Sequence, residues 1–116
     1  MLIELPWPPA ELAPNRRNGK HWSATNAVKV RYLADCRHLA LQAMGRWVPP
    51  GGTLALVITF VQPDKRRRDL DGMLSSIKSG LDGLAQALGV DDQYFEPVTI
   101  RREYGGKPGM VRVELV

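Results

Sequence analysis

The chain has 116 residues, of which 44% are hydrophobic and 24% are charged. That balance is typical of one globular domain, so we expect a single domain over residues 1–116. No apolar run approaches the roughly 18 residues of a membrane span, and the N-terminus lacks the regions of a signal peptide. One cysteine, Cys36, excludes an internal disulfide and a cysteine metal cluster. These features predict a cytoplasmic protein without a membrane partner.

The formal net charge is +4 and the isoelectric point is near 9.6, which favours an anionic partner. The cations are clustered rather than spread evenly. They gather in three groups, which are Arg16, Arg17 and Lys20; Lys65 to Arg68; and Arg101 with Arg102. The basic run over residues 65–68 is expected to hold a phosphodiester backbone.

The predicted elements begin with a short strand over MLIEL, residues 1–5, which PWPP stops because proline lacks a ladder donor. Residues 10–22 have the composition of a loop. A helix follows, which Ser23 or Thr25 caps and Gly45 ends. Cys36 falls on the apolar stripe of this helix, so we expect it in the core.

TLALVITFV, residues 53–61, is apolar on both alternating faces, which is typical of an interior strand with helices above and below. A second helix is expected over residues 71–88, followed by two strands that GGKPG joins as a hairpin. The order β-α-β-α-β-β predicts an α/β (α+β) fold with a small mixed sheet and two helices.

The stretch DKRRRDLDG, residues 64–72, concentrates charge directly behind the predicted interior strand. Open α/β sheets commonly place their sites at such strand ends. Asp69 and Asp71 share one face of an extended segment, and two neighbouring carboxylates repel each other unless a cation lies between them. Mg²⁺ takes such oxygen ligands together with phosphate oxygens and water. The simplest alternative is a solvated surface turn, and Asp91-Asp92 supplies further acids after the second helix.

Three motifs resemble, in the same order, those of the RusA family of Holliday-junction resolvases. They are LPWPP at residues 5–9, RRRDLD at 66–71 and DDQ at 91–93, so the resemblance covers nearly the whole chain. It implies a RusA-like, homodimeric, Mg²⁺-dependent endonuclease without an organic cofactor, of bacterial or phage origin. Such an enzyme cuts four-way (branched) DNA junctions by paired incisions in recombination, repair or phage DNA processing.

The resemblance implies that Asp69, Asp71 and Asp92 are the catalytic and metal-binding aspartates. Asp91 is the alternative to Asp92 as a metal ligand, and we favour Asp92. The expected DNA-binding residues are the clustered cations and one asparagine after LPWPP. They are Lys65, Arg66, Arg67, Arg68, Arg16, Arg17, Lys20 and Asn15.

Two departures from the family pattern bear on the site. Gly72 stands where the family usually has asparagine, and Ser75 stands where it has an essential lysine. Lys78 lies seven residues after Asp71, and in a continuous helix a step of seven returns to within ~20° of the same face. Long helical side chains lean toward the N-terminus, so Lys78 is expected to act as the catalytic lysine.

Two other functions stay open. In the first, Gly72 and the displaced lysine mark lost activity, and the chain is a non-catalytic module that binds branched DNA. In the second, the same carboxylates serve a different metal-dependent nuclease. A PD-(D/E)xK motif begins at Pro63-Asp64, but no well-placed acid and lysine follow it, so this alternative ranks last.

Overall fold

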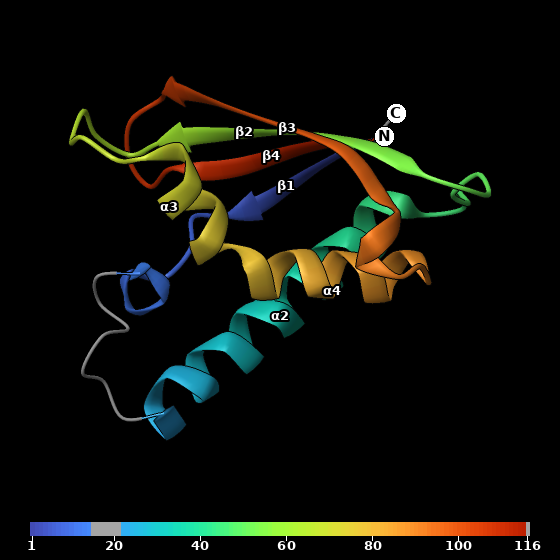
Figure 1. Cartoon of the computed structure of the whole chain (residues 1–116), viewed down its shortest axis with the longest axis horizontal. Coiled ribbons are helices and arrows are strands. Elements are labelled where there is room, and N and C mark those ends of the chain that lie inside the picture. The colour runs from blue at the N-terminus through green and yellow to red at the C-terminus, as the bar shows by residue number, and fades with distance from the viewer. Residues whose placement is uncertain (15–21, 116) are drawn as a thin grey trace.

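A computed structural model describes residues 1–14 and 22–115. These residues form a mixed α and β fold with a four-stranded sheet and three α-helices (Figure 1). The elements are β1 (Leu2–Pro6), the 3-10 helix η1 (Ala10–Leu12), α2 (Trp22–Met44), β2 (Leu54–Gln62), α3 (Leu70–Ser76), α4 (Lys78–Leu88), the 3-10 helix η2 (Asp92–Tyr94), β3 (Phe95–Tyr104) and β4 (Met110–Leu115). The predicted DNA-binding residues Asn15, Arg16, Arg17 and Lys20 lie outside the described part of the chain.

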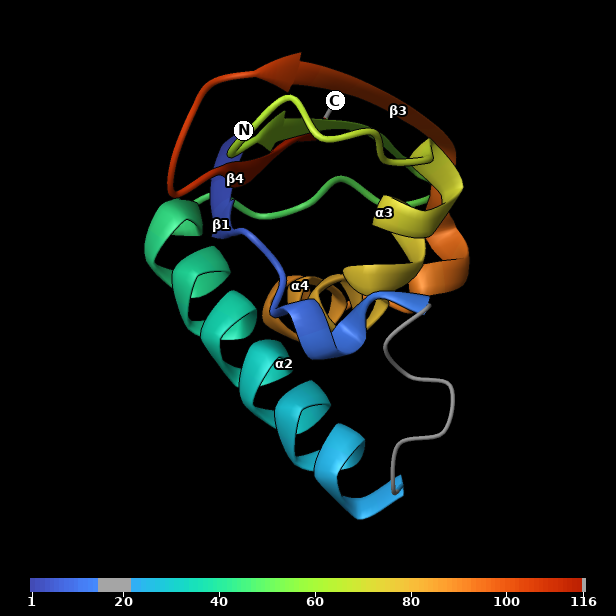
Figure 2. The ribbon, with the colours of Figure 1, turned by 90° about the vertical axis from the view of Figure 1, so that its left-hand side faces the viewer.

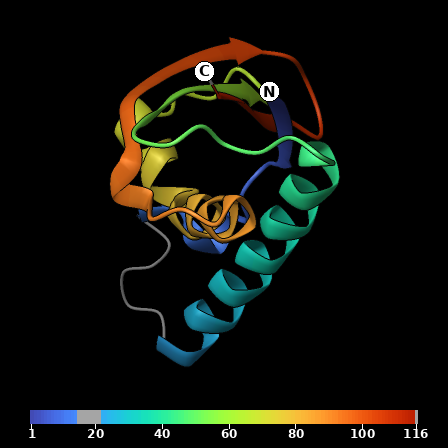
Figure 3. The same cartoon turned by 90° about the vertical axis from the view of Figure 1, so that its right-hand side faces the viewer.

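The strands are ordered β1-β4-β2-β3, with β2 parallel to β3 and the other neighbours antiparallel. This confirms a small mixed sheet with an interior strand near residues 53–61. The three described helices lie on one face of the sheet (Figures 1, 2 and 3), so the expectation of helices above and below β2 is wrong. Thr59 on the other face is only 1% exposed. It is covered by arginine: Arg101 Nε donates to Thr59 Oγ1 at 3.2 Å, and Arg112 lies opposite on β4.

The GGKPG loop, residues 105–109, does not close a hairpin, because β4 pairs with β1 and β2 rather than with β3. The loop crosses the end of β2 instead. The backbone N–H groups of Gly105 and Gly106 donate to the Gln62 carbonyl at 3.1 and 3.2 Å. A Cβ on Gly105 would collide with Val61 Cγ1. The absence of a side chain at Gly105 thus leaves room for Val61 at this crossing, and the predicted hairpin is wrong.

The single helix expected over residues 71–88 is in fact two helices. α3 ends at Ser76 and α4 begins at Lys78, with Ile77 between them at φ −103° and ψ 10°. Ile77 is fully buried in the core, and Ser76 Oγ donates to the Met73 carbonyl at 2.7 Å. The break occurs at a core residue without proline or glycine, so core packing holds it. The described part of the chain therefore has three α-helices rather than the predicted two.

The core lies between the sheet and the helices, and α2 crosses α4 beneath it (Figures 2 and 3). Two glycines of α4 allow this crossing. A Cβ on Gly83 would collide with the Leu33 carbonyl oxygen, and one on Gly80 would stand 3.0 Å from Cys36 Sγ. Cys36 is fully buried, as predicted. The crossing fixes the position of α4, the helix that carries Lys78.

Candidate active site

The basic loop, which we define as residues 63–69, leaves the carboxyl end of the interior strand β2. Two polar side chains of the sheet, the buried Gln62 and the partly exposed Arg102, donate hydrogen bonds to its backbone. Gln62 is fully buried, and its Nε2 donates to the Arg66 carbonyl at 3.1 Å. Arg102 Nη1 of β3 donates to the Arg68 carbonyl at 2.7 Å. These hydrogen bonds to backbone carbonyls hold the backbone of the loop in place.

Arg68 differs from its neighbours because its side chain is engaged inside the molecule. Its Nη1 lies 2.8 Å from Asp64 Oδ1, and its guanidinium carbon lies 5.3 Å from the centre of the Trp7 ring. The hydrogen bond from Arg68 lowers the pKa of the Asp64 carboxyl group. Lys65, Arg66 and Arg67, by contrast, are exposed. The predicted cationic surface is therefore formed by these three side chains, while Arg68 stabilises the loop.

Beside the loop lies an open cavity of about 620 Å³, which we call the proline pocket. Its apolar wall comes from the N-terminal segment and includes Trp7, Pro9 and Pro14. Its polar side comes from the basic loop and the start of α3. This side is lined by Arg66, Arg67, Arg68, Asp69 and Asp71.

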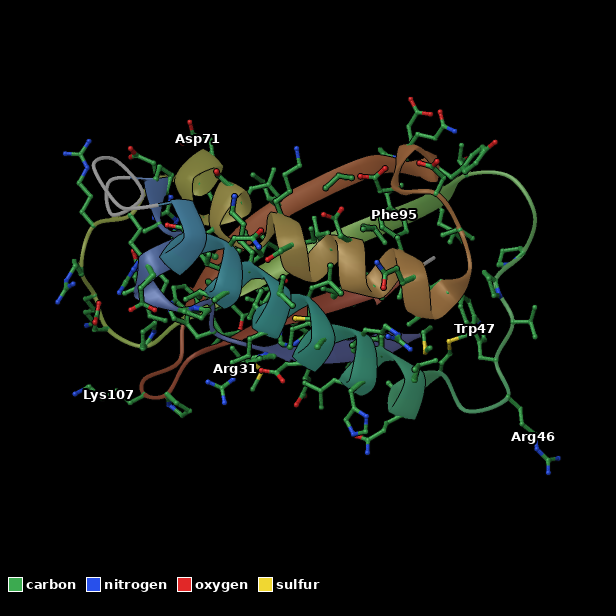
Figure 4. All side chains as sticks on the ribbon, turned by 90° about the horizontal axis from the view of Figure 1, so that it is seen from below. Arg31, Arg46, Trp47, Asp71, Phe95 and Lys107 are labelled. Atoms are coloured by element: carbon green, nitrogen blue, oxygen red, sulfur yellow. The ribbon has the colours of Figure 1, made fainter. Side chains whose placement is uncertain are left out.

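A second cavity, of about 440 Å³, lies on the other side of Asp71, and we call it the acidic groove. Its charged lining comes from α3, α4 and η2, and consists of Asp71, Lys78, Asp82 and Asp92. Its apolar floor includes Leu56, Leu74 and Phe95. Figure 4 shows Asp71 at the start of α3 and Phe95 at the start of β3 on the same side of α4.

Asp71, Lys78 and Asp92 thus line one groove, although they come from three different elements. Lys78 lines the groove from a different helix than the sequence predicted. The break at Ile77 redirects the chain, so Lys78 opens α4 instead of continuing the face of α3. Asp69 caps α3 with extended backbone angles and lines the proline pocket rather than the acidic groove. Asp71 lines both cavities and joins them.

The two acids at 91 and 92 are clearly distinguished. The Asp91 carboxylate accepts a hydrogen bond from the Gln93 N–H at 3.0 Å and so caps η2. Asp92 lines the acidic groove, whereas Asp91 does not line it. The geometry is consistent with the preference for Asp92 as a site residue.

Asp82 also lines this groove, although the sequence analysis did not single it out as a site residue. Burial raises the pKa of Asp82, the negative charge of Asp92 raises it further, and the positive charge of Lys78 opposes both effects. Lys78 and Asp82 are four residues apart on α4, so they occupy the same helical face. This spacing of four residues could have predicted the position of Asp82 from the sequence, because it puts Asp82 on the helical face that carries Lys78.

No three His, Cys, Asp or Glu side chains within residues 1–14 and 22–115 are close enough to form a ready-made metal site. Mg²⁺ does not require such a cage, because it usually binds through one or two carboxylates together with phosphate oxygens and water. Asp71 and Asp92 offer hard oxygen donors in one groove. By type, these donors are the oxygen ligands that Mg²⁺ takes together with phosphate oxygens and water.

Within the described ranges, no helix has both the length and the apolar character needed to cross a membrane. No known family model matches the chain. A protein of Xylella fastidiosa (strain Temecula1), described as an uncharacterized protein, is similar to it, with 39% identity over 95 residues. The match covers 80% of this chain and 61% of that protein, so the chain spans about three fifths of the length of this relative.

Proposed function

We propose that the chain is a Mg²⁺-dependent endodeoxyribonuclease of the RusA type that resolves four-way DNA junctions by paired incisions. The observation that carries this proposal is the convergence of Asp71, Lys78 and Asp92 on one groove. The exposed cations of the basic loop lie beside it, since Asp71 also lines the cavity formed by Arg66 and Arg67. Carboxylates for a metal and cations for a phosphate backbone are thereby adjacent.

Each residue has a distinct role in the proposed chemistry. Asp71 and Asp92 would hold Mg²⁺ in the acidic groove, and Asp69, which lines the neighbouring proline pocket, is the third acid of the proposed set. When bound, the ion supplies Lewis-acid stabilisation of negative charge on the scissile phosphate. The Lys78 ammonium group neutralises charge that develops on the same phosphate. Asp82, one helical turn further along α4, attracts and orients that ammonium group.

The DNA backbone is held by Lys65, Arg66 and Arg67, which are exposed on a loop with a fixed backbone. Contacts of this kind supply affinity and register but little sequence information. In the same proposal, Asn15, Arg16, Arg17 and Lys20 add a second set of DNA contacts. A twofold homodimer presents two acidic grooves, which suits paired cuts in two strands of like polarity.

A second candidate is a non-catalytic module that binds branched DNA. It is favoured by one observation: within the described ranges, the acids do not form a ready-made three-ligand metal site. In that case the basic loop keeps its role, and the acidic groove has no metal-dependent activity. A different metal-dependent nuclease remains a third candidate, which would cut DNA irrespective of branching.

The test compares a labelled four-way junction with linear duplex and single strands, each with and without Mg²⁺. Symmetric, Mg²⁺-dependent nicks confined to the junction are expected. Asp71→Asn and Asp92→Asn should abolish cleavage and retain junction binding, whereas Asp91→Asn, the matched neighbour outside the groove, should still cleave. Binding without cleavage by the unaltered protein supports the non-catalytic module, and equal cutting of all three substrates supports the general nuclease.

A further inference from the structure

We propose that the proline pocket binds the unstacked base of a nucleotide whose phosphate lies against Arg66 and Arg67. The inference deepens the proposed function, on which it rests for the identity of the ligand as DNA. It assigns a role to the apolar wall of this cavity, which the proposed chemistry does not use. A cavity of about 620 Å³ is within the range that holds small organic ligands in proteins.

The apolar wall of the pocket is rigid before any ligand arrives. Pro9 and Pro14 lose almost no side-chain entropy when a ligand packs against them. Trp7 is held in place, since its ring packs edge-on against Phe60 with centroids 6.4 Å apart and planes at 84°. Arg68 covers the Trp7 ring at 5.3 Å. A flat, largely apolar group that enters this pocket therefore meets a preformed surface.

The opposite side of the pocket carries Arg66 and Arg67 beside two carboxylates, Asp69 and Asp71. Arg66 and Arg67 are exposed, and neither guanidinium group has an ion-pair partner among residues 1–14 and 22–115. Guanidinium groups bind phosphate oxygens through paired hydrogen bonds. An apolar wall that faces two free cations matches the two halves of a nucleotide, a base and a phosphate. Proteins that hold unpaired nucleic acid combine these same two features.

The position of the pocket relative to the acidic groove gives the subsite a role. Asp71 lines both cavities, so a nucleotide in the pocket adjoins the proposed metal ligands. Bases of a continuous duplex are stacked and cannot enter a side pocket, whereas bases at a branch point are more easily unstacked. The subsite therefore favours DNA with unpaired or branch-point nucleotides and places the neighbouring phosphate at the groove.

The test is a binding measurement in metal-free buffer, so it does not depend on cleavage. The chain has three tryptophans, and replacing Trp22 and Trp47 by phenylalanine leaves Trp7 as the fluorescent reporter in the pocket. The probes are a single-stranded tetranucleotide and the same backbone with abasic sites. We expect saturable quenching of Trp7 by the first probe and affinity at least about tenfold lower for the second.

Ala13→Phe fills the pocket from its own lining and should reduce tetranucleotide affinity to the abasic level. Ala27→Phe, on the exposed face of α2, is the matched control and should bind as the parent does. Equal affinity for both probes overturns the base subsite, whether or not Ala13→Phe folds, and leaves only phosphate binding. Base-dependent binding without junction cleavage supports the subsite and refutes the nuclease. Junction cleavage with equal affinity for both probes supports the nuclease and refutes the subsite.

Discussion

The crossing of α2 and α4 sets the position of Lys78 and Asp82 on α4. Adding one methyl group at Gly83 tests how closely the two helices approach each other. In Gly83→Ala the added Cβ would collide with the Leu33 carbonyl oxygen and stand 3.1 Å from the Arg37 backbone nitrogen. Both neighbours belong to the backbone of α2, so no side-chain rotation relieves the contact. The two helices must move apart.

The expected size of the effect follows from two opposing terms. Alanine in place of glycine inside a helix stabilises by ~1 kcal/mol. Overpacking costs about 1–3 kcal/mol, and the upper end applies here because the contact is with backbone. The net loss in unfolding free energy is therefore about 2 kcal/mol. With an unfolding entropy of ~0.24 kcal/mol/K for a chain of this length, the midpoint of thermal unfolding falls by about 8 °C.

Circular dichroism melts of the wild type and two variants measure this effect. Gly72→Ala is the matched control, because Gly72 is also helical but a Cβ there meets no atom within 4 Å. It retains the propensity gain alone, so its melting temperature should rise, by at most about 4 °C. Opposite shifts of the two variants are expected. If Gly83→Ala is as stable as the wild type, the close approach of α2 and α4 is refuted.

The remaining predictions concern charge. The pKa of Asp82 is raised in the folded state, so the folded protein keeps the carboxyl proton to a higher pH than the unfolded chain does. Once the pH rises above the unfolded pKa of 3.8, this carboxyl group therefore reduces the free energy of unfolding. In metal-free buffer, the melting temperature of Asp82→Asn should therefore exceed that of the wild type at pH 7 and equal it near pH 3. A lower melting temperature of the variant at pH 7 contradicts the raised pKa of Asp82. Replacing Arg66 and Arg67 by alanine should reduce the slope of log K against log salt for duplex binding by about 1.8, or ~0.9 for each phosphate that the loop no longer neutralises. Arg46→Ala is the control, because Arg46 lies at the opposite end of the molecule from Asp71 (Figure 4), and it should leave that slope unchanged. If the double variant also has an unaltered slope, the basic loop does not contact DNA phosphates.

Patterns within one element predicted the structure well. The interior strand predicted over residues 53–61 is confirmed as β2 (Leu54–Gln62), because a long apolar run bounded by turn residues has few other solutions. The helix that ends at Met44 stops at Gly45, which has φ 52°, a conformation that favours glycine. In these cases the deciding interactions are local.

Features that depend on distant partners were missed. GGKPG has the composition of a hairpin, but β3 pairs in parallel with β2, so the loop must cross over to the far side of β2. The break at Ile77 has no proline or glycine to signal it, and it results from burial of that side chain in the core. The prediction of Lys78 as a site residue assumed a continuous helix, and that assumption is wrong because the helix breaks at Ile77, although Lys78 does line the acidic groove. Asp82 was missed because an acid four residues after a lysine usually forms only a surface pair.

The proposed activity depends on Asp71 and Asp92 sharing one metal ion between α3 and η2. Anomalous diffraction from a crystal soaked in Mn²⁺, which prefers the same oxygen ligands as Mg²⁺, locates that ion directly. We expect an anomalous peak in the acidic groove, bonded to carboxylate oxygens of both residues and absent in Asp92→Asn. A peak elsewhere, or one that persists unchanged in Asp92→Asn, contradicts the proposed metal site.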